Sequence, residues 1–383
     1  MMKRSLVLAV GAALSLAACS DASPVATRAS QAPLLAAGSG GIGGSYVVVL
    51  NEGADPRSVA AVAGVSPRHV YTAALNGFSA ALNAGQLNAL RNNRNVAYVE
   101  QDQEVRGAAT QSGAPWGIDR IDQPRLPLNG TYTYTQTGFN IYTYVIDTGI
   151  QTNHPEFGGR AAVAYDALGG NGQDCHGHGT HVAGIIGAKT YGIAKGVRLR
   201  AVRVLDCSGS GTTSGVIAGV DWVRVNRTNP AVANISLGGG LSAALNTAVN
   251  NLVNSGVFVA VPAGNSNADA CNFSPASAAP AMTVMASSST DARWPSSNYG
   301  SCTDIYAPGV NILSTWINSG TNTLSGTSMA SAHVAGVAVL HKSGNTVASP
   351  AIMTSWIINN AITNVITGNP AGTPNRLVNK NTL

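Results

Sequence analysis

Residues 324–336 have the sequence LSGTSMASAHVAG, in which Gly-Thr-Ser leads directly into a helix-like run of small residues. Two further stretches have a related design. VIDTG at 145–149 is a buried-strand pattern that ends in Asp and Gly, and HGHGTHVAG at 176–184 opens a second small-residue helix. Strand and helix patterns alternate through residues 109–383, which predicts an α/β fold with a mostly parallel sheet. In such folds the functional side chains gather at the carboxyl ends of the strands.

Each of the three stretches carries one residue of a type used in nucleophilic catalysis: Asp147, His178 and Ser328. Taken singly, these residues are weak signals, because Asp147 also suits an Asx turn and Ser328 suits a helix N-cap. Histidines at 176, 178 and 181 also suggest a metal site. Their spacing lacks the H-E-x-x-H pattern of zinc peptidases, however, and we expect His181 to be structural.

Together, D-T-G, H-G-T-H-V-A-G and G-T-S-M-A, in this chain order, resemble the subtilisin-like serine proteases, and within them the proteinase K and aqualysin branch. The resemblance covers essentially all of residues 109–383. It implies a subtilisin-like three-layer fold and a secreted serine endopeptidase that needs no catalytic cofactor. It also implies a nucleophile at Ser328, a general base at His178, an orienting carboxylate at Asp147 and an oxyanion donor at Asn265.

The resemblance further implies a groove in which an extended peptide lies between residues 207–211 and 236–238. Main-chain hydrogen bonds in such a groove depend little on sequence, so we expect broad specificity. The walls of the expected P1 pocket are small and uncharged, which favours apolar P1 residues. The expected substrate-binding residues are Gly209, Ser210, Ser236, Leu237, Gly238, Ala263 and Gly264.

Several positions depart from the family pattern, and they keep an alternative open. Pro262 stands where Ala is usual, Ser331 and Ala332 replace Thr-Pro, and His176 replaces an Asn-like residue. The first two departures could loosen the oxyanion region. The alternative is therefore a catalytically weak or inactive subtilisin-fold binding lipoprotein. An esterase is disfavoured, because the G-x-S-x-G elbow is absent around Ser328.

Five cysteines are present. Four of them can pair in three ways by sequence alone. The resemblance to aqualysin selects Cys175 with Cys207 and Cys271 with Cys302. These disulfides require an oxidising compartment, and the alternative is four reduced, buried thiols.

Structural calcium is the metal that the resemblance implies, at one or two sites. The first expected site combines the carboxylate of Asp304 with the carbonyl groups of Ala279 and Ala281, since Ca²⁺ prefers hard oxygen ligands. The second set is weaker, with a solvated turn as its alternative. It consists of Asp119, Asp122, Gln123 and Asn129.

The N-terminus has the pattern of an export signal. Residues 1–18 contain a positive start and a short apolar run, followed by Leu-Ala-Ala-Cys, which resembles a lipoprotein cleavage site with Cys19 as the lipidated residue. Ordinary cleavage after Ala18 is the alternative. We expect an exported enzyme, extracellular or periplasmic, whose precursor is attached to a membrane only through a lipid on Cys19.

Residues 19–44 have linker composition, and residues 45–108 follow with a β-α-β-β-α-β pattern, which predicts a small ferredoxin-like α+β domain. Asp55 with Pro56 predicts the start of its first helix, Asn76 with Gly77 a hairpin, and 86–91 its second helix. The domain resembles the inhibitory pro-domain of subtilisin-like proteases. We therefore expect a self-processing precursor that is cut between Ala108 and Ala109.

Composition excludes other classes. Only 10% of residues are charged and 45% are hydrophobic, which is unlike a disordered chain. The net charge is +5, but the basic residues are scattered, so we expect no nucleic-acid partner. The expected partners are protein and peptide substrates and the chain's own pro-domain, and the enzyme is expected to be a monomer.

Overall fold

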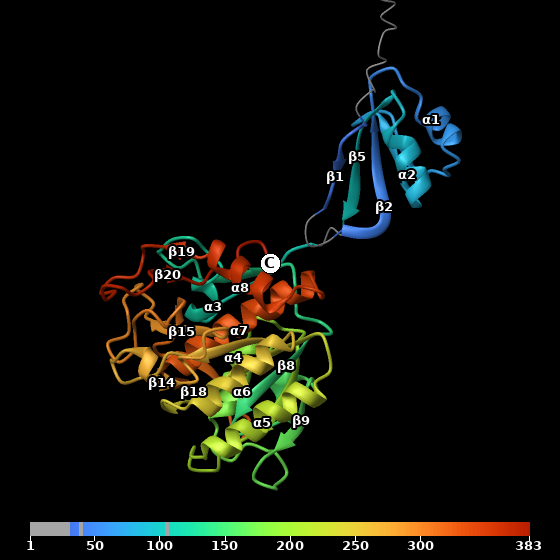
Figure 1. Ribbon diagram of the computed structural model, residues 1–383. Coiled ribbons are helices and arrows are strands. Elements are labelled where there is room, and N and C mark those ends of the chain that lie inside the picture. Colours follow the sequence, from blue (N-terminus) through green and yellow to red (C-terminus); the bar gives the residue numbers. More distant parts are fainter. Residues whose placement is uncertain (1–30, 38–40, 104–106) are drawn as a thin grey trace, which may run out of the picture. The chain divides into compact units, whose positions relative to one another are not determined.

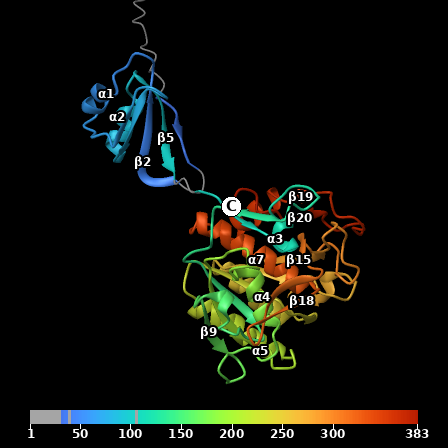
Figure 2. The same ribbon diagram turned by 180° about the vertical axis from the view of Figure 1, so that it is seen from behind.

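The computed structural model describes residues 31–37, 41–103 and 107–383. The chain divides into two compact units, residues 1–104 and 105–383 (Figures 1 and 2). The signal peptide predicted at 1–18 and the predicted lipidation site Cys19 lie outside the described residues. Within the described ranges, no helix has both the length and the apolar character needed to cross a bilayer.

The first unit is a five-stranded sheet in the order β1-β5-β2-β4-β3, with two helices on one face (Figure 1). Strands β5, β2, β4 and β3 pair antiparallel in that order, which is the ferredoxin-like arrangement. The predicted β-α-β-β-α-β order is confirmed. The elements are β1 Leu34–Leu35, β2 Gly41–Leu50, α1 Pro56–Val62, β3 His69–Tyr71, β4 Gly77–Ala81, α2 Ala84–Arg91 and β5 Val96–Gln103.

Local chemistry explains where the helices of this unit begin. Asp55 accepts hydrogen bonds from the backbone N–H groups of residues 57 and 58, and Pro56 is the first residue of α1, as predicted. Asn83 and Gln86 form a reciprocal capping box, so α2 begins at Ala84, two residues before the predicted start. Gly77 opens β4, where a Cβ would lie 2.1 Å from the carbonyl oxygen of Val48.

The flexible linker predicted for residues 19–44 is wrong in part. Strand β1 pairs parallel with Val99 and Glu100 on the outer side of β5, and β2 already begins at Gly41. Ala32 is buried in the core of this unit, and its backbone N–H donates to the carbonyl of Arg91 at 2.7 Å. The linker composition misled because this two-residue strand depends on its backbone pairing with β5, which composition does not indicate.

The second unit is built on a nine-stranded sheet in the order β19-β20-β16-β15-β13-β11-β8-β10-β9. Every neighbouring pair is parallel except β19 with β20, which confirms the predicted mostly parallel sheet. In sheet order the strands are Ile362–Thr363, Arg376–Leu377, Ile305–Pro308, Met282–Ser287, Phe258–Pro262, Ala231–Ile235, Tyr142–Asp147, Arg198–Arg203 and Ala161–Asp166.

Helices cover both faces of this sheet and make three layers. One face packs against α5 and α6, and the other packs against α4, α7 and α8. Both faces of the sheet are apolar, because side chains alternate along each strand. In β8, Tyr144 and Ile146 face the layer of α5 and α6, and Val145 faces the layer of α4, α7 and α8. The helices are α3 Trp116–Arg120, α4 His178–Gly187, α5 Thr213–Asn226, α6 Ala243–Asn254, α7 Thr327–Gly344 and α8 Pro350–Asn359.

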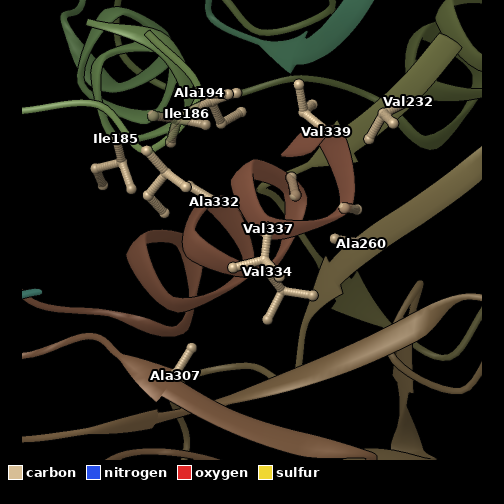
Figure 3. Close-up of a cluster of buried hydrophobic side chains, with 14 of the residues drawn as sticks. Ile185, Ile186, Ala194, Val232, Ala260, Ala307, Ala332, Val334, Val337 and Val339 are labelled. Carbon is tan, nitrogen blue, oxygen red and sulfur yellow. The ribbon is translucent and has the colours of Figure 1, made fainter. Parts of the chain in front are cut away.

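Helix α7 is the centre of the larger core. Figure 3 shows its valines between Ile185 and Ile186 of α4 and the alanines at 260 and 307 of the sheet. The small residues that follow the G-T-S motif therefore bury the helix against both neighbours. Three two-stranded ribbons complete the unit: β6 Ala109–Ser112 with β7 Thr131–Tyr134, β12 Gly239–Gly240 with β14 Phe273–Ser274, and β17 Ile312–Trp316 with β18 Gly320–Leu324.

Candidate active site

Three elements bring the predicted catalytic residues to the carboxyl edge of the sheet. Asp147 is the last residue of β8, His178 is the first residue of α4, and Ser328 is the second residue of α7. Nδ1 of His178 donates to the two carboxylate oxygens of Asp147 at 2.8 and 2.9 Å. Asp147 is fully buried, so its charge is not screened by water at this contact.

The protonation of His178 is set by two opposing effects. Burial of the ring lowers its pKa, but the charge of Asp147 and the hydrogen bond to it outweigh burial, so the pKa lies above its ordinary 6.5. Because Nδ1 donates to Asp147, the neutral ring has its lone pair on Nε2. That nitrogen is the one that can accept a proton from a nucleophile.

The hydroxyl of Ser328 is held by Ser236. Ser328 Oγ donates to the carbonyl oxygen of Ser236 at 3.1 Å, and no hydrogen bond joins it to His178 in the part of the chain that the structure describes. The side chain of Ser236 in turn donates to the carbonyl of Ser328 at 3.2 Å, and its oxygen lies 3.0 Å from the hydroxyl oxygen of Ser331. Long or misdirected catalytic hydrogen bonds are common in enzymes without substrate.

Asn265 is positioned by a residue that the sequence analysis missed. Its Oδ1 accepts from the backbone N–H of Thr327 at 3.0 Å and from the Thr327 hydroxyl at 2.7 Å. This orientation leaves the amide N–H₂ of Asn265 beside Ser328, where it has no acceptor among the described residues. The Ser328 N–H lies in the first turn of α7, where amides have no intrahelical acceptor. The position of Thr327 within G-T-S was the available signal.

Asn298 is a second residue that sequence reasoning missed. Its side chain donates to the carbonyl of Ala263 at 2.9 Å and accepts from the N–H groups of Ser266 and Ala268 at 2.9 and 3.0 Å. Gly264 has φ +103°, and a Cβ there would lie 2.4 Å from Nδ2 of Asn298. The contact is tertiary, so no local pattern could have indicated it.

Two adjoining pockets surround these groups. One, of about 510 Å³, is lined by Gly209, Ser210 and Ser236. The other, of about 350 Å³, is lined by Ala263, Gly264, Asn265 and Ser328. Residues 237–240 line both pockets. All seven residues predicted to bind substrate therefore line one continuous groove, which also reaches His178.

The departures from the family pattern leave this arrangement intact. Pro262 is the last residue of β13 and keeps its register with Val284 of β15. Ser331 donates its hydroxyl to the carbonyl of Ser328 at 3.0 Å, and Ala332 is buried inside the unbroken α7. The expected loosening of the oxyanion region has no counterpart in these contacts.

The structure contains the two disulfides that the resemblance selected, Cys175–Cys207 and Cys271–Cys302. His181 is structural, as expected: its Nε2–H donates to the carbonyls of Ile312 and Asn322, both at 3.0 Å. Burial lowers the pKa of His181 to about 4, so the ring is neutral at physiological pH. Within residues 31–37, 41–103 and 107–383, no group of three His, Cys, Asp or Glu residues could hold a metal ion.

The first predicted calcium set has a feature that fits a cation. Asp304 accepts a hydrogen bond from the N–H of Thr283 at 2.7 Å through Oδ2, while Oδ1 has no hydrogen-bond partner among the described residues. Burial raises the pKa of Asp304 to about 6. The turn that contains Ala279 and Ala281 leads into β15, which begins at Met282, and the N–H that bonds to Asp304 belongs to the second residue of this strand.

The second predicted calcium set does not fit. Lys380 places its ammonium group 2.9 Å from Oδ1 of Asp122 and already neutralises that carboxylate. Gln123 accepts from the N–H of Asn129, and Asn129 accepts from the next turn of chain. Only Oδ1 of Asp119 is buried without a partner. Protein groups therefore satisfy most of these oxygens.

Comparison with known proteins agrees with the geometry. The model of the subtilase family matches residues 139–380. The chain belongs to the subtilase family. The peptidase inhibitor I9 family matches residues 45–108, the range predicted for the pro-domain. The chain is an exported, subtilisin-like serine endopeptidase preceded by an inhibitory pro-domain, and the inactive binding lipoprotein finds no support.

Relatives extend over most of the chain. The "Extracellular serine proteinase" of Thermus sp. (strain Rt41A) is 48% identical over an alignment of 407 positions, gaps included. The alignment covers 98% of this chain and 99% of the relative. "Proteinase R" of Parengyodontium album is 46% identical and covers 82% of this chain and 83% of its own length. The crystal structure of a cold-adapted subtilisin-like serine proteinase superposes with a TM-score of 0.69 at 51% identity, covering 70% of this chain and 99% of its own.

Proposed function

We propose that the chain hydrolyses peptide bonds with Ser328 as the nucleophile, His178 as the general base and acid, and Asp147 as the residue that orients His178. The observation that carries the proposal is the pair of contacts from Nδ1 of His178 to buried Asp147. They fix the tautomer that leaves Nε2 free to take a proton from Ser328. They also stabilise the charged ring that forms after the transfer.

The first step is acylation. The Ser328 hydroxyl turns from the carbonyl of Ser236 toward His178, gives up its proton to Nε2 and attacks the substrate carbonyl carbon. The negative charge that develops on the carbonyl oxygen is met by the side-chain amide of Asn265 and the Ser328 N–H. His178 then passes its proton to the leaving amine, and the peptide bond breaks.

The second step reverses these roles with water. His178 takes a proton from water, the hydroxide attacks the acyl-Ser328 ester, and the proton returns to the serine oxygen as the second product leaves. The groups that act in both steps belong to the chain itself, the substrate and water. The free N–H₂ of Asn265, fixed by Thr327, supports its part in both.

The groove supports broad specificity with apolar P1 residues. The smaller pocket, which contains Ser328, is lined by glycines and by small residues such as Ala263 and Ala276, and it holds no charged side chain. An apolar P1 side chain has no charged or polar group to desolvate when it enters such walls, and its transfer out of water is favourable. Peptide p-nitroanilides with Phe or Leu at P1 should therefore be cleaved with a higher kcat/KM than those with Lys or Asp.

A calcium ion at Asp304 belongs to the proposal as a structural element. The carboxylate of Asp304 with the carbonyls of Ala279 and Ala281 would hold the ion, which would supply the charge that balances a partly buried carboxylate. Its place is outside the reaction. The carboxyl burial that raises the pKa of Asp304 is the support for it.

Activation belongs to the proposal as well. The enzyme would cut its own chain between Ala108 and Ala109, and the 45–108 domain would inhibit it until it is degraded. If Cys19 is lipidated, the tether stays with the pro-domain, and the monomeric catalytic domain is released by its own reaction. Fractionation tests this: a Ser328→Ala precursor should remain with membranes, and Cys19→Ala should make it soluble. A soluble Ser328→Ala precursor that retains Cys19 would refute the tether.

The experiment that tests the catalytic assignment is Ser328→Ala. The variant should fold, retain full precursor length and hydrolyse no peptide substrate, because the remaining groups have no nucleophile to activate. Circular dichroism and mass spectrometry provide the fold and length controls. Normal processing and turnover in this variant would disprove the assignment.

A further inference from the structure

His176 is the ionisable side chain of the substrate groove that the mechanism does not use. Apart from His176 and His178, no ionisable residue lines either pocket in the described part of the chain. Its ring lies 6.4 Å from that of His178 and 6.3 Å from the ring of Trp316, between centroids. His176 therefore lies beside the catalytic residues but has no role in the proposed reaction steps.

The hydrogen bonds of His176 fix which nitrogen faces the groove. Nδ1 accepts from the backbone N–H of His178 at 3.3 Å. In the neutral ring the proton is therefore on Nε2, which has no hydrogen-bond partner among the described residues. Asp174 lies close, but its carboxylate is occupied by the backbone N–H groups of residues 176 and 177 and by Thr180. His176 presents an unused N–H donor.

A glycine keeps this donor accessible. Gly209, whose backbone passes beside the ring, has φ +77°, and a Cβ there would lie 3.1 Å from Nε2 of His176. A side chain at 209 would therefore crowd the donor. With glycine, the space beside Nε2 remains part of the 510 Å³ pocket.

The position of the donor along a bound peptide follows from strand geometry. A P1 side chain enters the pocket that contains Ser328 and Asn265. Successive side chains of an extended peptide point to opposite sides, so the P2 side chain points away from that pocket, toward the wall formed by His178 and His176. The Nε2–H of His176 thus faces the P2 side chain.

We infer that His176 is a specificity-determining residue that favours substrates with a short, amide-bearing P2 side chain, Asn, over an apolar one. The inference rests on the proposed function, since it needs an acyl-enzyme at Ser328. Its chemistry is one neutral hydrogen bond from Nε2–H to a side-chain oxygen. A bond of this kind changes discrimination by about two- to tenfold.

Two substrates and four variants test the inference. The substrates are tetrapeptide p-nitroanilides that differ only at P2, Asn against Leu, and the measured quantity is the ratio of their kcat/KM values. In His176→Phe and His176→Ala the ratio should fall about two- to tenfold. In His176→Gln, whose amide N–H₂ reaches the place of Nε2, the ratio should be retained. His341→Phe, on the far end of α7, should retain it too.

Two outcomes overturn the inference. One is an unchanged Asn-to-Leu ratio in His176→Phe and His176→Ala. The other is an equal fall in His176→Gln, which would indicate that ring shape and not the donor matters. A wild-type enzyme that cleaves neither substrate, nor any peptide with Phe or Leu at P1, would instead overturn the proposed function.

Discussion

The hydroxyl of Thr327 lies between two parts of the oxyanion region: it donates to Oδ1 of Asn265 at 2.7 Å and accepts from the N–H of Gly264 at 3.1 Å. One side chain therefore fixes both the amide of Asn265 and the backbone that carries it. Since a hydrogen bond to a developing charge helps only when the donor is already in place, the contact should matter to the transition state more than to substrate binding.

Thr327→Val should lower kcat about tenfold and leave KM nearly unchanged, because Asn265 loses a partner that orients it. Thr327→Ser, which keeps the hydroxyl, should stay within about twofold of the wild type. Asn265→Ala should cost more, about 100- to 1,000-fold in kcat, a range measured on another enzyme of this family. Steady-state kinetics on one peptide anilide compares all three. Equal losses in the Val and Ser variants would refute this role of the hydroxyl.

The pH dependence of kcat/KM should follow the neutral form of His178. Because the charge of Asp147, the hydrogen bond to it and the charge of Asp174 together outweigh burial and raise the pKa of His178, activity should increase with pH through a midpoint above 6.5. Asp147→Asn removes the charge that raises this pKa. The midpoint should therefore move to lower pH, while kcat falls about 10⁴-fold because the tautomer is no longer fixed. An unmoved midpoint in Asp147→Asn would argue against the coupling.

Chelation should destabilise the enzyme in a pH-dependent way. Burial raises the pKa of Asp304 to about 6, so without a cation the fold favours the protonated carboxyl and loses stability as pH rises from about 4 to 6. A bound calcium ion reverses this loss by mass action. EDTA should therefore lower Tm more at pH 8 than at pH 5.

The matched variant for the calcium prediction is Asp304→Asn, which keeps the size of the side chain and removes its charge. Its Tm should respond less to EDTA than that of the wild type, while Asp122→Asn, whose carboxylate pairs with Lys380, should respond as the wild type does. Calorimetry of the three proteins with and without EDTA gives the six Tm values. If EDTA leaves the wild-type Tm unchanged at pH 8, there is no stabilising ion at Asp304.

Each disulfide closes a loop of about thirty residues, 32 for Cys175–Cys207 and 31 for Cys271–Cys302. Loss of either should lower the free energy of unfolding by about 3–4 kcal/mol in the chain-entropy model. Replacing both cysteines of one pair by serine, followed by denaturant unfolding, measures the effect. A loss well below 1 kcal/mol for both pairs would show that the unfolded chain is already constrained in other ways.

The sequence predicted the catalytic residues better than the residues that hold them in place. Asp147, His178, Ser328 and Asn265 could be found because each lies in a short motif at the end of a strand or the start of a helix, where local pattern and site coincide. Asn298 could not, because it supports the 263–268 loop from a distant part of the chain. Strand β1 was missed for a related reason: two residues gain strand character only from their pairing with β5.

The ion pair that neutralises part of the second calcium set also could not be predicted from the sequence around that set. Asp119, Asp122, Gln123 and Asn129 form a plausible ligand set along the chain, but the cation that pairs with Asp122 is Lys380, which is brought there by the fold of the C-terminus. Oxygen ligands that are close in sequence indicate a site only when no protein cation reaches them.

The most direct test of the central claim is to locate the covalent adduct of a serine-directed fluorophosphonate on the purified, processed enzyme. The account predicts one adduct, on Ser328, together with complete loss of peptidase activity. It also predicts that His178→Ala reacts far more slowly, because the hydroxyl has lost its base. Peptide mapping by mass spectrometry identifies the labelled residue. An adduct on another serine, or full activity in enzyme labelled at Ser328, would contradict the account.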